Sequence, residues 1–130
     1  MAGEPILVVD DNPANLKLLR LLLSTQAYAV RTAGDAGEAL AILREFTPRL
    51  ILMDLQIPGM DGFELTRLLK RDAATQGIVI VALTAYAMKG DEEKARAAGC
   101  DDYVSKPIDT RTLPALIARH LADPGGPRAA

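Results

Sequence analysis

The chain of 130 residues contains a single cysteine, Cys100. With one thiol, no disulfide can form within the chain and no multi-thiolate metal site can be built. The sequence therefore excludes the disulfide-stabilised class of small domains, and we expect a reducing, cytoplasmic location. We interpret Cys100 itself as a small, partly buried filler of the interior.

Long apolar runs are also missing. The densest apolar stretch, residues 16–23, is interrupted by Lys17 and Arg20 and is far shorter than a membrane-spanning helix requires. The acidic N-terminal segment is followed by only four apolar residues, fewer than a secretory signal needs. The formal net charge of -2 offers no broad positive field. We therefore expect neither direct nucleic-acid binding nor membrane binding.

The remaining composition is that of one folded domain. Hydrophobic residues make up 49% of the chain and charged residues 25%, which is typical of globular proteins and not of disordered ones. A chain of this length can bury a single core of ordinary size. We expect one domain over residues 1–122, followed at residues 123–130 by a flexible tail or a linker remnant rich in proline and glycine.

Five short apolar runs alternate with five longer segments of helical character. This alternation predicts an α/β fold with a parallel sheet and helical crossovers. Right-handed crossovers favour a doubly wound, flavodoxin-like sheet of five strands in the order 2-1-3-4-5. Runs that are apolar without alternation predict central strands covered on both faces. The runs are residues 6–9, 28–30, 50–53, 78–83 and 103–104, of which the first, third and fourth are expected to be central.

Capping residues indicate where the helices begin and end. Asn12 before Pro13 predicts an N-cap followed by proline at the first helical position. Gly99 is expected to end the fourth helix, where glycine adopts the left-handed conformation without steric cost. Reciprocal caps are predicted at Asp35 with Glu38 and at Asp61 with Glu64, and Asp109 is expected to cap the last helix.

Polar side chains follow four of the five runs. In an open α/β sheet, ligands bind outside the carboxyl ends of the strands, so these side chains should share one crevice. Carboxylates gathered there repel each other unless a cation lies among them, and oxygen donors favour magnesium or manganese. A lysine and a threonine hydroxyl beside them suit a phosphoryl group. The residues are Asp10 and Asp11, Asp54, Thr84, and Ser105 with Lys106.

Four segments of the chain resemble the signature blocks of the CheY-like family of response-regulator receiver domains. The resemblance runs from about residue 6 to about residue 121 and is closest to single-domain regulators and hybrid-kinase receivers. It implies a phosphoacceptor of two-component signalling that catalyses only its own phosphorylation and dephosphorylation. The implied partners are a histidine kinase or histidine phosphotransfer protein and a downstream protein target. The segments are residues 8–11, 53–62, 83–85 and 105–107.

The resemblance implies a role for each acidic site residue. Asp54 resembles the residue that attacks phosphorus in a phosphohistidine to give an aspartyl phosphate. Asp11 and Asp54 resemble carboxylate ligands of the magnesium ion. Gln56 resembles the residue that binds this ion through its main-chain carbonyl, and Asp10 the residue that supports the ion through water.

The same resemblance implies a switch. Lys106 resembles the lysine that pairs with the phosphoryl group and with the free acceptor carboxylate. Thr84 and Tyr103 resemble the pair whose hydroxyl turns toward the phosphoryl oxygen while the ring moves inward. The bond between Lys106 and Pro107 is cis in the family. We also hypothesise that Tyr86 shields the acyl phosphate and slows its hydrolysis.

Other features leave two interpretations open. On a helical wheel of the first helix, Leu18 lies at the margin of the apolar side and Leu21 nearly opposite to it. Both are either harmless exposed leucines or a docking surface, because the first helix of receiver domains packs on the helical bundle that carries the phosphohistidine. We interpret the pair Asp101 and Asp102 as a turn, and His120 as a solvated side chain.

Three other functions compete with the receiver interpretation. A phosphatase of the haloacid-dehalogenase type needs a second aspartate two residues after the nucleophile, where this chain has Gln56. A nucleotide-binding domain needs a glycine-rich turn after the first strand, where residues 11–13 read Asp-Asn-Pro. A receiver-like adaptor regulated only by binding is disfavoured by the complete set of acidic, hydroxyl and lysine residues.

Overall fold

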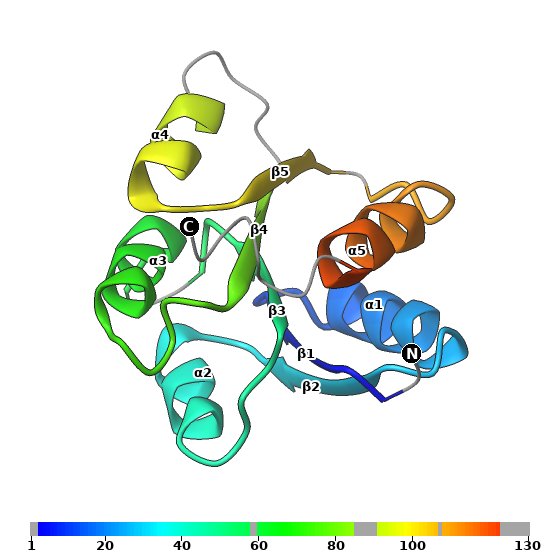
Figure 1. Cartoon of the computed structure of the whole chain (residues 1–130). Coiled ribbons are helices and arrows are strands. Elements are labelled where there is room, and N and C mark those ends of the chain that lie inside the picture. The colour runs from blue at the N-terminus through cyan, green and yellow to red at the C-terminus, as the bar shows by residue number, and fades with distance from the viewer. Residues whose placement is uncertain (1–2, 58–59, 85–90, 107, 123–130) are drawn as a thin grey trace.

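The computed structural model describes residues 3–57, 60–84, 91–106 and 108–122 (Figure 1). Five parallel strands form one sheet in the order β2-β1-β3-β4-β5, with helices on both of its faces. The predicted doubly wound, flavodoxin-like fold and its strand order are confirmed. The strands are β1 (Pro5–Val9), β2 (Ala29–Ala33), β3 (Leu50–Asp54), β4 (Val79–Thr84) and β5 (Asp102–Ser105).

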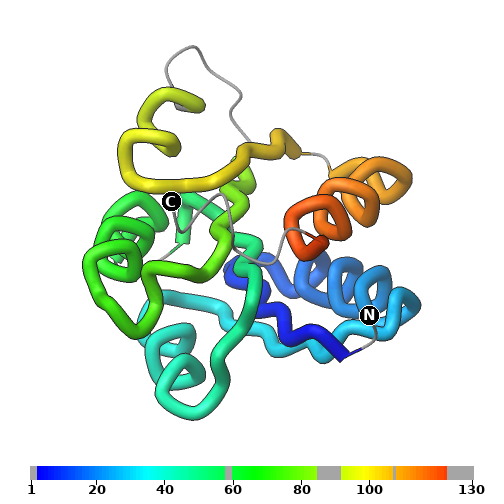
Figure 2. Tube along the Cα trace, viewed as in Figure 1, coloured from blue at the N-terminus to red at the C-terminus, as the bar shows by residue number. Residues whose placement is uncertain are grey.

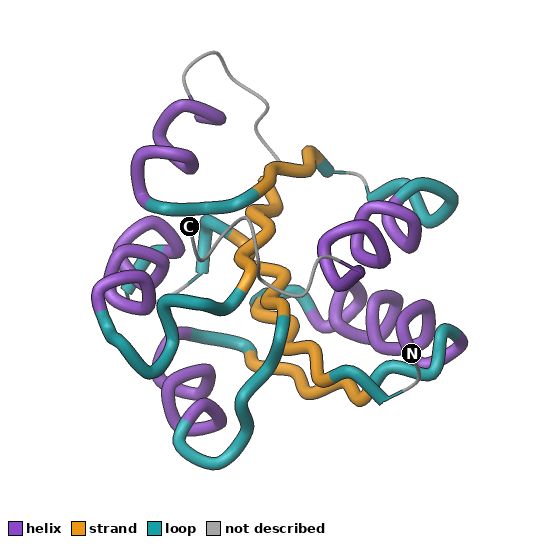
Figure 3. Tube along the Cα trace, viewed as in Figure 1, coloured by secondary structure: helices purple, strands orange, loops and turns teal. Residues whose placement is uncertain are grey.

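The helices form two layers, one on each face of the sheet (Figures 1 and 3). Side chains of a strand point alternately to opposite faces, so each central strand contributes to both cores. In β1, Leu7 and Val9 pack with the core under α2, α3 and α4, while Ile6 and Val8 pack with the core under α1 and α5. The helices are α1 (Pro13–Thr25), α2 (Ala36–Leu43), α3 (Gly62–Arg71), α4 (Asp91–Ala98) and α5 (Leu113–Ala122).

The three central strands are the ones predicted from their uninterrupted apolar runs. Every residue of β3 and β4 is buried, and so is all of β1 after Pro5. The edge strand β2 was predicted too short, because it continues through Arg31 and Thr32 to Ala33. Its exposure alternates along the strand, which places polar side chains at positions that an apolar-run criterion rejects. Figure 2 shows that α5, which ends the described chain, lies beside α1.

Most of the predicted helix boundaries are confirmed. The side chain of Asn12 accepts hydrogen bonds from the N–H groups of Ala14 and Asn15, and Pro13 begins α1. Gly99 follows the end of α4 with a φ of +112°. The prediction for Asp109 was wrong, because α5 begins only at Leu113 and the Asp109 carboxylate instead accepts the N–H of Arg111 in the preceding turn.

At the two other predicted caps, the aspartate accepts the N–H of the glutamate as expected. Asp35 accepts the N–H of Glu38 at 2.7 Å, as expected for an N-cap. The carboxylate of Glu38 returns to the N–H of Gly34 and not to that of the cap residue. At the start of α3, Asp61 accepts the N–H of Glu64 at 2.9 Å.

Asp101, just before β5, and Asp102, its first residue, link neighbouring elements, so the interpretation of both residues as a simple turn was wrong. Asp101 Oδ2 accepts the N–H of Ile80 at 2.9 Å and pairs with Lys70 Nζ of α3 at 3.0 Å. Asp102, the first residue of β5, pairs with His120 Nε2 of α5 at 2.8 Å. His120 is largely covered, with 14% of its side chain exposed, and is therefore not the solvated residue predicted.

The contact between Asp102 and His120 should contribute to the free energy of unfolding in a pH-dependent way. Burial raises the pKa of Asp102. The hydrogen bonds from His120 and from the Tyr103 N–H outweigh this effect, together with the charges of His120 and Arg119. The pKa of Asp102 therefore lies below its usual value. A lowered pKa stabilises the fold above the unfolded value near 3.8 and ceases to do so as pH falls through the folded value. We expect His120→Ala to lower the free energy of unfolding by about 1 kcal/mol at neutral pH.

Urea unfolding monitored by circular dichroism at several pH values measures this effect. The difference between the two proteins should shrink once the pH falls below about 4. Arg96→Ala is the matched control, because the pair between Arg96 and Glu92 is solvent-exposed and should contribute only a few tenths of a kcal/mol, about the usual value. Equal losses in both variants would contradict the assignment.

Candidate functional site

The site lies where the strand order of the sheet reverses direction. Strand β2 pairs with one edge of β1, and β3 pairs with the other edge of β1. Such a switch point opens a crevice at the carboxyl ends of the strands. The pairing register places Val9 opposite Met53, so the residues that follow them, Asp10 and Asp54, come to lie side by side.

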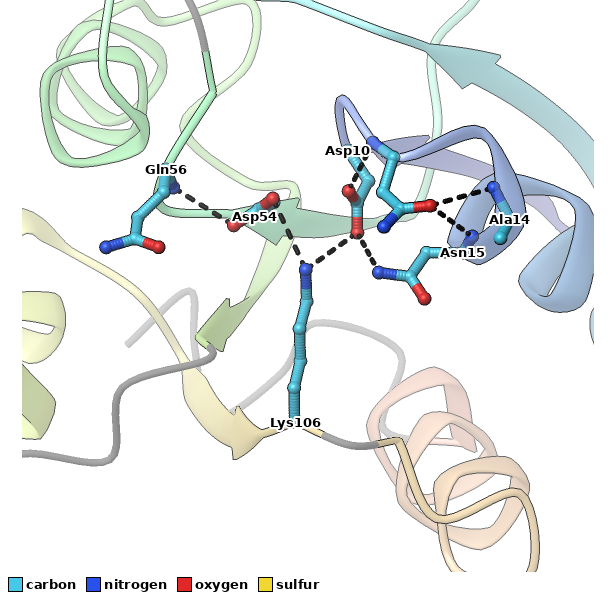
Figure 4. Close-up of polar contacts among 7 residues, drawn as sticks. Asp10, Ala14, Asn15, Asp54, Gln56 and Lys106 are labelled. Carbon is cyan, nitrogen blue, oxygen red and sulfur yellow. Dashed lines mark hydrogen bonds and ion pairs between the residues drawn. The ribbon is translucent and has the colours of Figure 1, made fainter.

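Asp10 is fully buried and has partners at both carboxylate oxygens. Its Oδ1 accepts the N–H of Asn12 at 2.9 Å, and its Oδ2 accepts from Asn15 Nδ2 at 3.3 Å and from Lys106 Nζ at 3.0 Å (Figure 4). Asn15 was not identified from the sequence as a site residue. Its spacing from Asp10 reaches the first turn of α1, but a single asparagine there is not a recognisable signal.

Asp54 ends β3 and is only 4% exposed. Its Oδ1 accepts the N–H of Gln56 at 3.0 Å, and its Oδ2 lies 3.3 Å from Lys106 Nζ. Burial raises the pKa of Asp54 and the charge of Asp10 raises it further, while the Gln56 N–H and Lys106 oppose that shift only in part. Two buried carboxylates thus share one lysine, and the site retains an excess of negative charge.

Lys106 connects the two carboxylates from the far edge of the sheet. It follows β5, and its side chain extends to Asp54 and Asp10, as Figure 4 shows. Burial alone would lower the pKa of Lys106, but the hydrogen bond to Asp10 and the charges of Asp54 and Asp10 raise it above its ordinary value. The lysine therefore stays cationic at neutral pH. Its main-chain N–H also donates to the carbonyl of Thr84 at 2.7 Å.

The carboxylates can supply a divalent cation with oxygen ligands. One oxygen each from Asp10, Asp11 and Asp54 can be chosen so that all lie within 4.8 Å of one another, and Asp11 is solvent-exposed. This donor set contains only hard oxygens, and Lys106 balances only one of the charges. The residues therefore fit magnesium or manganese better than a soft metal. Gln56 lies beside them, with its N–H directed to Asp54 (Figure 4).

The structure also places the hydroxyl and aromatic residues predicted for the switch. Thr84 is the last residue of β4 and is 2% exposed. It pairs with Ser105 in the register of β4 and β5. Tyr103, within β5, is partly buried and packs against the core that α2, α3 and α4 cover. The predictions for Tyr86 and for the bond to Pro107 concern residues outside the described part of the chain, as does the expected tail at residues 123–130.

A glycine that the sequence did not single out supports the loop after Asp54. The N–H of Gly62, the first residue of α3, donates to the carbonyl of Leu55 at 3.1 Å, and the N–H of Leu55 donates to Leu83 O of β4 at 3.0 Å. A Cβ atom on Gly62 would lie 2.6 Å from Leu55 Cα and 2.7 Å from Asp54 O. The close approach of α3 to the main chain at Asp54 and Leu55 therefore depends on glycine.

In the described ranges, no helix combines the length and the apolar character needed to cross a bilayer.

Comparison with known proteins assigns this arrangement to a family. Residues 6–118 match the model of the response regulator receiver domain. The polar-differentiation response regulator DivK of Brucella anthropi is 42% identical over 120 residues, which is 92% of this chain and 98% of the relative.

Solved structures agree with the sequence match. A CheY-like receiver domain protein from Methanospirillum hungatei is 31% identical with a TM-score of 0.86, over 94% of this chain and 96% of that one. The receiver domain of the sensor histidine kinase PA1611 from Pseudomonas aeruginosa, which has a magnesium ion in its active-site cleft, is 33% identical with a TM-score of 0.85, over 94% of this chain and all of that one. The chain described here belongs to the response regulator receiver family and is a receiver domain of two-component signalling.

Proposed function

We propose that Asp54 accepts a phosphoryl group from the phosphohistidine of a histidine kinase or a histidine phosphotransfer protein. The observation that carries this proposal is the position of its carboxylate, which is buried at the end of a central strand, 3.3 Å from Lys106 Nζ and beside Asp10. This geometry offers a nucleophilic oxygen together with a fixed cation that can balance the charge of the incoming group.

Asp54, Lys106 and Thr84 have different roles in the phosphoryl transfer. A carboxylate oxygen of Asp54 forms the bond to phosphorus while the bond between phosphorus and the partner's imidazole nitrogen breaks, and the imidazole then takes up a proton. Lys106 stays charged, because its acidic neighbours raise its pKa, and it pairs with a phosphoryl oxygen. The Thr84 hydroxyl donates a hydrogen bond to another. Beyond catalysing its own phosphorylation and dephosphorylation, the domain would act on no separate substrate.

We propose magnesium as the cofactor, with manganese as a substitute. The carboxylates of Asp11 and Asp54 and the main-chain carbonyl of Gln56 would hold the ion, and Asp10 would support it through water. The proposal is supported by the convergence of the three carboxylates and by the magnesium ion in the related receiver domain of PA1611. When bound, the ion would offset the charge of the crowded acids and of the phosphoryl oxygens.

Intact-mass spectrometry with acetyl phosphate as the donor tests this function. The wild-type chain should gain the mass of one phosphoryl group when magnesium is present. Addition of excess EDTA should suppress this gain, and manganese should restore it. Phosphorylation at an unchanged rate without any divalent cation would refute the proposed metal requirement.

We propose that phosphorylation changes partner binding through Thr84 and Tyr103. Thr84 lies at the site, and its carbonyl accepts the N–H of Lys106, while Tyr103 lies in β5 between that contact and the contact of Asp102 with α5. A movement of the Thr84 hydroxyl toward a phosphoryl oxygen would thus shift residues of β5. The output would be altered binding of a downstream protein target, in a phosphorelay or as a single-domain regulator.

Receiver domains interact with histidine kinases or phosphotransfer proteins, and we propose that this chain does so through α1. Leu18 is 41% exposed and Leu21 is 59% exposed, and these two are the most exposed large hydrophobic residues of the described chain. Both lie on the helix that follows Asp10 and Asp11. An exposed apolar face on this helix suits packing against a helical bundle that brings its phosphohistidine to Asp54.

Leu18→Asp should slow phosphotransfer from a histidine kinase that phosphorylates the wild-type chain by about tenfold or more, because it places a charge in an apolar contact. Phosphorylation by acetyl phosphate should not change, since that small donor needs no docking surface. Rapid-quench autoradiography measures the first rate, and mass spectrometry the second. An unchanged kinase reaction, or an equal loss with both donors, would rule out docking through α1.

A further inference from the structure

The surface of α2 and α3 carries two adjoining depressions, and neither is lined by the carboxylates, the threonine or the lysine of the Asp54 site. The larger, of about 360 Å³, lies between the two helices, and the smaller, of about 280 Å³, lies along α3. Leu68 lines both of them, and α2 and α3 are neighbours in Figure 1. We call this surface the α2–α3 groove and define it by Leu40, Leu43, Arg44, Arg67, Leu68 and Arg71.

The base of the groove is apolar and incompletely covered. Leu40 and Leu43 of α2 and Leu68 of α3 are each partly buried, packing against the core while part of their surface remains open to the groove. Apolar surface of this kind gains free energy when a second apolar side chain covers it.

The arginines of the groove have no partner within the described residues. Arg44 follows α2, and Arg67 and Arg71 lie on α3, and all three are exposed. None of the ion pairs and side-chain hydrogen bonds of the described chain involves them. Arginines elsewhere on the surface mostly do have an acidic partner: Arg31, Arg49, Arg96, Arg111 and Arg119.

The net charge of the groove is opposite in sign to that of the chain as a whole. The chain carries a formal net charge of -2, whereas three arginines line the groove against two acids, Glu64 and Asp72. One carboxylate oxygen of Asp72 already accepts the N–H of Ala74 at 2.9 Å. Cations around an apolar base are complementary to a ligand with apolar side chains and flanking carboxylates.

We propose that the α2–α3 groove binds an acidic amphipathic segment of a protein partner. Leucine-like side chains of that segment cover Leu40, Leu43 and Leu68, and its carboxylates pair with Arg44 and Arg67. Guanidinium groups bind carboxylates through two parallel hydrogen bonds, which favours a carboxylate-bearing ligand. This binding goes beyond phosphoryl acceptance, because neither the Asp54 site nor the exposed leucines of α1 take part in it.

A synthetic peptide tests the proposal on the whole chain. The probe is an acetylated twelve-residue helical peptide with two leucines four positions apart, flanked by glutamates, and carries a fluorescein label for anisotropy. We expect saturable binding at low ionic strength that weakens as salt rises. In heteronuclear NMR spectra of the labelled chain, the shifted resonances should belong to α2 and α3. Shifts confined to α1 would overturn the assignment of the groove.

Charge-reversal variants identify the residues involved. Arg67→Glu combined with Arg44→Glu should raise the peptide's Kd by about tenfold or more, and Arg67→Gln should do so by a smaller factor. Arg20→Glu is the matched control, because Arg20 is an exposed arginine on α1 with no side-chain partner among the described residues. The Kd of this variant should stay near that of wild type. Thermal unfolding and acetyl phosphate labelling should be unchanged in all of these variants.

Further outcomes would contradict the proposal. Equal weakening by Arg20→Glu and by the groove variants would indicate attraction by general charge. Equal binding of a peptide with glutamines in place of the glutamates would remove the role of the arginines. Binding of a single-stranded oligonucleotide with the same pattern of NMR shifts, but more tightly than the peptide, would assign the groove to a nucleic acid instead.

Discussion

An Asp54→Asn variant is expected to take up no phosphoryl group from acetyl phosphate, a loss of about a thousandfold or more in rate. An amide oxygen is a far weaker nucleophile than a carboxylate and cannot form an acyl phosphate in its place. Asparagine keeps the shape of the side chain, and its Oδ1 can still accept the N–H of Gln56. The loss therefore reflects chemistry and not a change of packing.

The same substitution should leave the fold at least as stable as wild type. The raised pKa of Asp54 arises from burial and from the neighbouring charge of Asp10, so removal of the negative charge relieves a repulsion that opposes folding. Lys106 keeps its contact with Asp10 at 3.0 Å. Intact-mass spectrometry and thermal unfolding, recorded without divalent ions, measure the two effects on the same sample.

Asp109→Asn serves as the matched control, because Asp109 is a solvent-exposed aspartate in the turn before α5. It should label like wild type. Persistent labelling of Asp54→Asn would place the acceptor on another residue, and a variant that lost its fold would be tested again as Asp54→Ser. If both variants still took up phosphate, Asp54 would not be the acceptor.

The substitution Gly62→Ala should reduce the free energy of unfolding by roughly 2–4 kcal/mol. The added methyl group would meet Leu55 Cα at 2.6 Å and Asp54 O at 2.7 Å, both of them main-chain atoms that cannot rotate aside. Either α3 must move outward or the segment after Asp54 must shift. Both movements disturb the acceptor, so we also expect slower labelling by acetyl phosphate. Chemical denaturation and labelling rates measure the two consequences.

Gly77→Ala is the control for this prediction. Apart from Gly77 and its two chain neighbours, no described residue has a heavy atom within 4 Å of the position that a Cβ on Gly77 would occupy, and its turn is on the surface between α3 and β4. We expect it to leave stability unchanged or to raise it by about 0.5 kcal/mol, because alanine restricts the unfolded chain. Similar stabilities of Gly62→Ala and Gly77→Ala would show that the contact between α3 and the acceptor loop is loose.

Strands and helix starts were predictable where a local pattern carries the information. The uninterrupted apolar runs at residues 50–53 and 78–83 predicted central strands, and Asn12 predicted the start of α1, because burial and capping impose chemical requirements on neighbouring residues. The pattern failed at β2, whose Arg31 and Thr32 lie at a sheet edge that tolerates polar side chains. It failed again at Asp109, where a turn intervenes before α5.

Contacts between distant segments could not be predicted in the same way. Nothing around His120 in the sequence indicates that it meets Asp102, since the two residues are eighteen positions apart in the chain. The role of Gly62 depends on the distance between α3 and the loop after Asp54. Asn15 acquires its role only because α1 returns its side chain to Asp10.

The sequence by itself determined the fold class, the strand order and the identity of the acids, threonine and lysine at the strand ends, because these follow from local patterns of polarity combined with the handedness of crossovers. Only the tertiary structure decided that Lys106 spans the crevice to two buried carboxylates at 3.0 and 3.3 Å. Only it revealed the α2–α3 groove, whose arginines have no side-chain partner in the described part of the chain. Such features depend on distances between segments far apart in the chain, and those distances arise when the layers pack together.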